Sequence, residues 1–271
     1  MLESNLKAEF IRLFREFSGH NHPYQGWSDL VHMWSFAFQN AIPQRQETEE
    51  RYLEIAGKYS KDKLKLAQRM LSLITDMLEP KPADVLGPLY LELEISNKDS
   101  GQFFTPPELS QLMANMMTGN PREQVEREEF ITLYEPACGA GGMILAYVNC
   151  LISEGLNSAE SIWVSAIDVD PVVARMCHLQ LSLWNVPAEI VVGNTLTQEV
   201  KEYFHTPAHH LGLWEFKIRR KQNQEKHPAQ SVSESQTVRA ENPMNLYRAI
   251  KEGDIPYEKL DQYKEQLKLD F

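Results

Sequence analysis

The chain contains 271 residues, of which 42% are apolar, and carries a formal net charge of −11. That composition is enough to bury a sizeable core, and no apolar run reaches membrane-spanning length, so we expect a folded cytoplasmic protein without membrane contact. The acidic balance excludes patch-wide electrostatic attachment to nucleic acid, because neutralising phosphates requires concentrated Lys and Arg.

The cysteines and the paired histidines match no metal or disulfide pattern. Cys138, Cys150 and Cys177 have spacings typical of neither a zinc site nor a disulfide framework, and their apolar neighbours predict buried thiols. His20 and His22 have no carboxylate or cysteine cluster beside them at ligand spacing. We therefore predict no metal site.

Amphipathic helices are predicted throughout the first 80 residues. The first helix has one apolar face, formed by Leu6, Phe10, Leu13, Phe14 and Phe17. A second helix is expected from about Ser28 to just before Pro43, and two more follow before residue 80. We interpret residues 1–80 as a helical bundle domain. A small helical bundle does not always need as much apolar surface as Trp27, Trp34 and Phe38 supply. We therefore also expect a homodimer that buries the faces of these helices.

A short helical segment from Asp84 to Leu93 is followed by the sequence Gly101-Gln102-Phe103-Phe104-Thr105-Pro106. Thr105 as N-cap and Glu108 as its capping-box partner predict a helix over residues 107–117. The N–H groups at this helix start, beside two aromatic rings, suit a carboxylate of a small ligand. A hydrophobic staple that only fixes the start of the helix is the alternative.

A glycine-rich turn follows the first predicted strand. The apolar run at 130–134 leads into it and residues 143–148 leave it at helical spacing, which predicts a buried strand, a turn and a helix. Without Cβ atoms, Gly139, Gly141 and Gly142 allow the backbone to approach a small molecule closely at a helix N-terminus. A tight turn that serves only packing is the alternative.

Two further strands end in polar residues. A buried strand over 161–167 ends at Asp168, and a carboxylate there can accept hydrogen bonds from both hydroxyls of a ribose. We assign this role to Asp168 and a helix cap to Asp170, although the two could exchange roles. A third strand from Glu189 ends at Asn194, whose amide offers a donor and an acceptor to a base. Together these strand ends are typical of a nucleoside site on a parallel sheet.

The motif at 101–106, followed by Glu135-Pro136-Ala137-Cys138-Gly139-Ala140-Gly141-Gly142, resembles the cofactor half of the N-6 adenine DNA methyltransferases, particularly the modification subunits of type I restriction systems. The resemblance implies an α/β fold: a Rossmann-like S-adenosylmethionine-dependent methyltransferase core, shortened, with an N-terminal helical domain. It also implies that the Phe-Thr-Pro turn contacts the methionine part of the cofactor, and that Asn194 pairs with its adenine. The implied cofactor-binding residues are Phe104, Thr105, Pro106, Glu135, Pro136, Ala137, Cys138, Gly139, Gly141, Gly142, Asp168, Val169, Asn194 and Leu196.

The second half of the chain departs from that family. It lacks the Asn-Pro-Pro-aromatic tetrapeptide with which adenine-methylating members hold a flipped base. In the expected region, residues 203–212 are either a divergent substitute, with His205 or His209 near the base, or a loop. Residues 222–241 have the composition of a linker and 245–271 read as two polar helices, so no further buried strand is expected. We place the cofactor domain at 81–221 and the polar C-terminal part at 222–271.

Two functional hypotheses follow. The chain is either an S-adenosylmethionine-dependent DNA adenine methyltransferase of reduced form, working with restriction-system subunits, or an inactive cofactor-binding protein used in sensing, assembly or restriction interference. The basic run Lys217-Ile218-Arg219-Arg220-Lys221 is the candidate DNA contact, and a solvated helix end is its alternative explanation.

Overall fold

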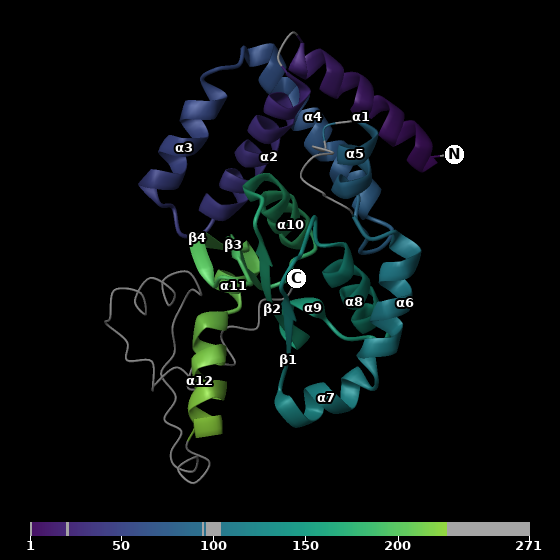
Figure 1. Cartoon of the computed structure of the whole chain (residues 1–271), viewed down its shortest axis with the longest axis vertical. Helices are drawn as coiled ribbons and strands as arrows, with labels where there is room; N and C mark the ends of the chain where they lie inside the picture. Colours follow the sequence, from purple (N-terminus) through teal and green to yellow (C-terminus); the bar gives the residue numbers. More distant parts are fainter. Residues whose placement is uncertain (1, 20–21, 94, 96–103, 227–271) are drawn as a thin grey trace, which may run out of the picture. The chain divides into compact units, whose positions relative to one another are not determined.

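A computed structural model describes residues 2–19, 22–93, 95 and 104–226 of the chain (Figure 1). It divides into two compact units, residues 1–208 and 209–271. The helices expected over 245–271 lie outside the described residues, as do His20, residues 101–103 and most of the expected linker.

Four helices occupy the first 80 residues, as predicted: α1 (Leu2–Ser18), α2 (Pro23–Asn40), α3 (Gln46–Ala56) and α4 (Lys61–Leu78). Helix α2 begins five residues before the expected start at Ser28. The Nδ1 atom of His22 accepts a hydrogen bond from the backbone N–H of Tyr24 at 3.3 Å, and Pro23 takes the first helical position. Proline is favoured there because its fixed φ suits a helix and its missing N–H is not needed.

The aromatic side chains of α1 and α2 are interior. Trp27 is fully buried, with the rings of Phe10 and Phe14 edge-on at 6.1 and 5.7 Å. Trp34 is buried in the same core, and Phe38 packs against it half-buried. The surface on which the homodimer expectation rested is therefore occupied by the protein's own core. That core continues into α5 (Leu86–Glu92) and into the helix over Pro171–Leu183, so packing is continuous across the boundary expected at residue 80.

Within the described residues the sheet has four strands, β1 (Ile131–Glu135), β2 (Ile162–Asp168), β3 (Ala188–Asn194) and β4 (Glu199–His205), in the order β1-β2-β3-β4 (Figure 1). The three predicted strands are confirmed and parallel. Strand β4 was not predicted. It pairs antiparallel with β3, and of its residues only Phe204 is buried, so the sequence lacks the apolar run that marks a core strand.

Helices α8 (Gly142–Ser153) and α10 (Pro171–Leu183) connect the parallel strands, with the short α9 (Ser158–Ser161) before β2. One face of the sheet is buried in a core shared with these two helices, through residues such as Val164 and Ile190. On the other face, Thr132 and Tyr134 of β1 are exposed. Because β1, β2 and β3 run parallel, their carboxyl ends meet at one end of the sheet.

Helix α10 takes part in both cores. Its residues Val173 and Met176 pack with the N-terminal helices, whereas Cys177 and Leu181 pack with the sheet. The whole helix from Val172 to Leu181 is buried, including its polar side chains. This position makes α10 the element through which the N-terminal helices reach the sheet.

Helix α6 (Pro107–Thr118) is confirmed, but its predicted capping box is wrong. Pro106 occupies the N-cap position and no side chain caps the helix, so Thr105 and Glu108 do not pair as expected. Small buried residues, Ser110, Ala114 and Thr118, allow α6 to pack closely on α8. Its opposite face carries exposed apolar side chains: Leu109, Leu112, Met113, Met116 and Met117. Helix α7 (Pro121–Glu128) then leads into β1.

The chain continues through α11 (Pro207–Leu211) into α12 (Trp214–Lys226). The basic run noted above lies on α12, where the ammonium group of Lys217 sits 4.2 Å from the ring centre of Trp214 and Arg219 pairs with Glu215 at 2.7 Å. None of the helices in the described ranges is both long and apolar enough to cross a membrane.

Candidate cofactor site

The carboxyl ends of β1, β2 and β3 place Glu135, Asp168 and Asn194 at the same end of the sheet. Two hydrogen bonds tie these ends together. The backbone N–H of Gly139 donates to Oδ2 of Asp168 at 2.9 Å, and the hydroxyl of Thr195 donates to the carbonyl of Pro136 at 2.6 Å. We call these three strand ends, with the turn over 136–142, the strand-end site.

The glycine turn has a backbone that only glycine adopts easily. Gly139 and Gly141 have φ values of +54° and +93°. The N–H of Gly141 donates to the carbonyl of Cys138 at 2.8 Å, which closes the turn. A Cβ atom on Gly141 would lie 3.0 Å from Sγ of Cys177. Both the positive φ and the close approach of α10 therefore require glycine at this position.

Substituting alanine at Gly141 should destabilise the protein more than substituting alanine at Gly119. Gly119 also has a positive φ, +57°, but nothing lies within 4 Å of its Cβ position. Each variant carries a backbone cost of about 1–3 kcal/mol, and only Gly141→Ala adds the contact with Cys177. Urea unfolding of both variants measures the difference. Equal loss of stability in the two variants would mean that the Cys177 side chain moves away from the new Cβ atom at no measurable cost.

The structure decides which aspartate caps α10. Oδ1 of Asp170 accepts hydrogen bonds from the N–H groups of Val172 and Val173 at 2.8 and 3.3 Å, so Asp170 is the helix cap. Asp168 accepts from Gly139 through Oδ2 and from the N–H of Asp170 through Oδ1, each at 2.9 Å. The N–H of Val169 also bonds to Asp168, and since each carboxylate oxygen has two lone pairs, Asp168 retains capacity to accept from a hydroxyl group.

The environment of Asp168 raises its pKa. Burial is the main cause, and the negative charge of Asp170 adds to it. The N–H groups of Asp170 and Gly139 act in the opposite direction because they stabilise the ionised form. These two N–H groups offset only part of the cost of burying the ionised carboxylate, so further hydrogen-bond donors from a ligand would stabilise it.

The end of β3 offers an amide donor beside apolar surface. Oδ1 of Asn194 accepts from the N–H groups of Leu196 and Thr197 at 2.9 and 3.3 Å, and within the described ranges its Nδ2 has no partner. Leu196 is 94% exposed, and Val169, which follows Asp168, is 61% exposed. Exposed apolar side chains next to a carboxylate and an amide fit a planar base attached to a ribose.

The Phe104 ring lies against the glycine turn, 35 residues further along the chain. A Cβ atom on Gly139 would be 3.7 Å from the ring, and one on Gly87 would be 3.1 Å from it. Tyr90 holds the other side of the ring edge-on, at 5.9 Å between ring centres. The two motifs of the sequence analysis are therefore brought together, with Thr105 and Pro106 exposed beside them.

The remaining expected residues shape the turn itself. Oε1 of Glu135 accepts from the N–H of Ala137 at 3.2 Å, so this carboxylate bends back onto its own turn. Cys138 is buried, and its N–H donates to the carbonyl of Ile167 at 2.8 Å. The hydrogen bond with Cys177 and burial together raise the pKa of the Cys138 thiol well above its usual value, which keeps it neutral. The prediction of three buried thiols is confirmed.

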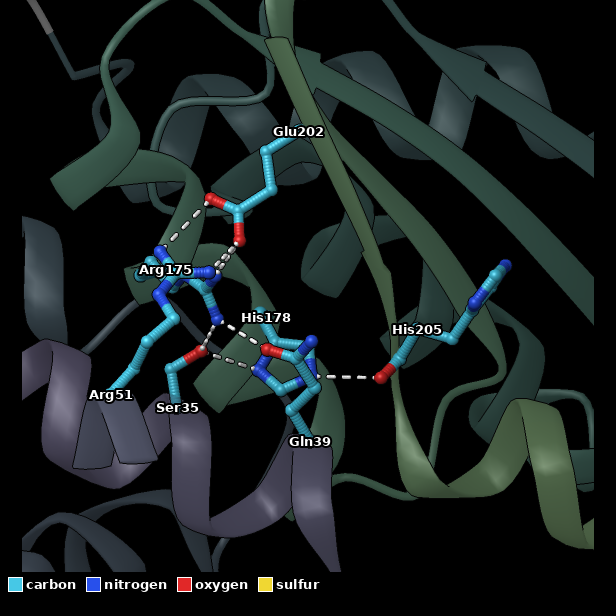
Figure 2. Close-up of polar contacts among 7 residues, drawn as sticks. All are labelled: Ser35, Gln39, Arg51, Arg175, His178, Glu202 and His205. Carbon is cyan, nitrogen blue, oxygen red and sulfur yellow. Dashed lines mark hydrogen bonds and ion pairs between the residues drawn. The ribbon is translucent and has the colours of Figure 1, made fainter. Parts of the chain in front are cut away.

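A polar cluster centred on the buried Arg175, which the sequence analysis missed, holds β4 to the helices (Figure 2). We call it the Arg175 cluster; it consists of Ser35, Gln39, Arg51, Arg175, His178, Glu202 and the carbonyl of His205. Arg175 of α10 donates to Gln39 at 2.6 Å, to Ser35 at 3.1 Å and to Glu202 at 2.7 Å. Its guanidinium carbon lies 4.4 and 3.8 Å from the ring centres of Phe36 and Phe204.

One carboxylate, Glu202, faces the two arginines of the Arg175 cluster. Burial lowers the pKa of Arg175 to about 9, against the attraction of Glu202. Burial alone would raise the pKa of Glu202, but the hydrogen bond from Arg51 and the charges of both arginines lower it. At neutral pH Arg175 and Glu202 are therefore both charged.

His178 joins the same cluster in a defined tautomer. Its Nε2 lies 3.0 Å from the carbonyl of His205, which only accepts, so Nε2 carries the proton (Figure 2). In the neutral ring Nδ1 then accepts the hydroxyl proton of Ser35 at 2.9 Å. Ser35, in turn, accepts from Arg175.

His205 does not reach the strand-end site. In the antiparallel register it lies opposite Glu189, at the start of β3, whereas Asn194 ends that strand. Its Nε2 contacts Oε2 of Glu189 at 3.2 Å. His205 and Asn194 therefore lie at opposite ends of β3, and a role for His205 beside a target base stays a prediction.

Comparison with known proteins agrees with this geometry. Residues 83–216 match the family model for N-6 DNA methylases. These residues belong to the N-6 DNA methylase family. The type I restriction enzyme MpnII methylase subunit of Mycoplasma pneumoniae is 24% identical over 148 residues, which cover 51% of this chain and 26% of that protein. The chain thus spans about a quarter of the length of this curated relative.

This chain is also similar to a Listeria monocytogenes protein of known crystal structure, described as a class I S-adenosylmethionine-dependent methyltransferase. The match covers 69% of this chain and 52% of the Listeria chain, with a TM-score of 0.38 and 11% sequence identity. Membership of the N-6 DNA methylase family implies S-adenosylmethionine as the cofactor. The strand-end site fits that molecule, because Asp168 keeps accepting capacity for a ribose hydroxyl and Asn194 keeps an amide donor for a base.

Proposed function

We propose that this chain binds S-adenosylmethionine at the strand-end site and takes part in methylating the N6 amino group of adenine in DNA. The observation that carries the proposal is the hydrogen bond from the N–H of Gly139 to the Asp168 carboxylate. The turn that contains Gly139 also contacts Phe104. When bound, the cofactor supplies the methyl group.

Within this proposal, different residues of the strand-end site and its neighbours bind the ribose, the adenine and the methionine part of the cofactor. Asp168 accepts a hydrogen bond from a ribose hydroxyl, and Nδ2 of Asn194 donates to the adenine. Val169 and Leu196, both exposed, cover the base. Phe104, Thr105 and Pro106 contact the methionine part, above the turn that contains Gly139.

DNA as substrate and a restriction system as setting are supported by the family match and by the name of the Mycoplasma relative. Within this proposal the protein acts in the cytoplasm, and α12 contributes the basic run over 217–221 as a DNA contact. Partner subunits supply further recognition surface. A homodimer also stays a proposal, now resting on the exposed apolar face of α6 rather than on Trp27 and Trp34; the mass of the protein in solution tests it.

The alternative is a protein that binds the cofactor without transferring its methyl group. It is favoured by the absence of an Asn-Pro-Pro-aromatic tetrapeptide from the sequence. The position of His205 adds support, because this candidate substitute lies at the other end of β3. In that case the site would serve sensing, assembly or interference with restriction.

Two measurements on the full chain separate these functions. Calorimetric titration is expected to show binding of S-adenosylmethionine. Transfer of a labelled methyl group to mixed-sequence DNA, with and without subunits of a type I restriction system, is the expected sign of catalysis. Binding without transfer under every condition would favour the inactive alternative, and absence of binding would reject both.

A further inference from the structure

The side chain of Gln180 in α10 is completely buried and uses its whole hydrogen-bonding capacity. Oε1 accepts from the N–H groups of Val85 and Leu86 at 2.7 and 3.2 Å. Nε2 donates to the carbonyl of Ala140 at 2.7 Å and to Oδ1 of Asp84 at 3.0 Å. The backbone partners fix the orientation of the amide, because N–H groups only donate and a carbonyl only accepts.

One of these bonds acts on the glycine turn directly. The carbonyl of Ala140 and the N–H of Gly141 belong to a single planar peptide unit. Gln180 holds the carbonyl, while the N–H donates to the carbonyl of Cys138 at 2.8 Å. The peptide is therefore fixed at both ends, and Gly141 is left with its positive φ of +93°.

The other bonds act on the segment beneath Phe104. Asp84, Val85 and Leu86 lie at the start of α5, and Oδ1 of Asp84 also accepts from the N–H of Gly87 at 2.8 Å. Phe104 packs between Gly87 and Gly139. A single side chain thus connects the two backbone segments that together support this ring.

We propose that Gln180 is a positioning residue for the cofactor site. It sets the orientation of the Ala140–Gly141 peptide, and it holds the start of α5 at the distance at which Phe104 can rest on Gly139. The identity of the ligand rests on the function proposed above. The effect of Gln180 on the turn does not, because its hydrogen bonds form without any ligand.

The test compares Gln180→Met with Leu73→Ala in the full chain. Methionine has a similar length but cannot form any of the four hydrogen bonds. Leu73 is fully buried in α4, where its truncation lowers stability by leaving a cavity in the N-terminal core. Hydrogen exchange of the Gly139 and Gly141 amides without ligand is the first measurement, and calorimetric titration with S-adenosylmethionine is the second.

We expect Gln180→Met to speed exchange at both glycines and to weaken cofactor binding about tenfold, the effect of about one lost hydrogen bond on the turn. Leu73→Ala should leave the dissociation constant within about twofold of the wild type, since it lies outside the site. Should Gln180→Met fail to fold, Gln180→Asn keeps a buried amide that is too short to reach Ala140 and Val85 at the same time.

Unchanged exchange at Gly139 and Gly141 in the Gln180 variant, or equal weakening of binding by Leu73→Ala, would overturn the positioning role. A wild-type chain that does not bind S-adenosylmethionine would instead reject the proposed function. The exchange rates would still decide whether Gln180 holds the turn.

Discussion

Replacing Glu202 by Gln is expected to lower the free energy of unfolding by about 2–3 kcal/mol, less than the cost of breaking a fully buried ion pair, because the Glu202 side chain is 28% exposed. Glu202 is the carboxylate that both Arg175 and Arg51 contact. Without it, two guanidinium groups remain close together beside the ring of Phe36 with no opposing charge. Chemical denaturation of the full chain measures the loss.

Arg175→Met should cost less than Glu202→Gln. Methionine fills the apolar space between Phe36 and Phe204, and Glu202 keeps Arg51 as its partner. A matched control is Glu199→Gln, the same substitution at an exposed position of β4. The interpretation fails if Glu202→Gln is no less stable than Glu199→Gln.

The Glu202 variant should also change how stability depends on acid. Because the folded protein lowers the pKa of Glu202, the unfolded chain takes up the proton first as the pH falls. The stabilisation is present above the ordinary glutamate pKa of about 4.3 and is lost as the pH falls through the lowered value. Over that pH range the free energy of unfolding should change less with pH for Glu202→Gln than for the wild type. An unchanged pH dependence would contradict the ion-pair assignment.

The strand-end site was predictable because its residues follow local rules. A strand, a glycine turn and a helix follow one another at 131–153, although β1 buries only Ile131, and parallel strands bring their polar ends together. The choice of Asp168 over Asp170 also followed from strand end and helix start, and the cap bonds of Asp170 agree with it. The assignment of ligand roles to these residues is still a proposal.

The Arg175 cluster and β4 were not predictable from local patterns. Most residues of β4 are exposed or half-buried, and Phe204 is its one buried residue. The strand is held in place because Glu202 and Phe204 contact Arg175 of α10 from the edge of the sheet. The start of α6 at Pro107 was predicted, but its N-cap was misjudged by one residue, because Pro106 rather than Thr105 precedes its first turn. Such features depend on tertiary partners that spacing does not reveal.

One signal for the missed residues was present in the sequence. Arg175, His178 and Gln180 interrupt an otherwise apolar helix, and the structure buries all three. Polar side chains that are buried in this way must have partners elsewhere in the chain. The partners of Gln180 lie in the glycine turn and at the start of α5, and those of Arg175 lie in α2 and β4, so α10 links the cofactor site to the N-terminal helices.

Asp168→Ala is expected to weaken binding of S-adenosylmethionine about 100-fold, the effect of losing a hydrogen bond to a charged acceptor. The substitution also frees the N–H groups of Gly139 and Asp170, which disturbs the turn itself. A simple loss of affinity would therefore not identify the ribose contact.

A ligand lacking the hydroxyls separates the two effects. The wild-type protein should bind S-adenosylhomocysteine much more tightly than its 2′,3′-dideoxy analogue, whereas Asp168→Ala should bind both equally weakly, because disturbance of the turn affects both ligands alike. Since burial raises the pKa of Asp168, wild-type affinity should begin to fall on acidification above the ordinary aspartate pKa of about 3.9. The preference for the hydroxylated ligand should fall over the same range, because the ionised carboxylate is the stronger acceptor. If the preference survives in Asp168→Ala, another group binds the ribose.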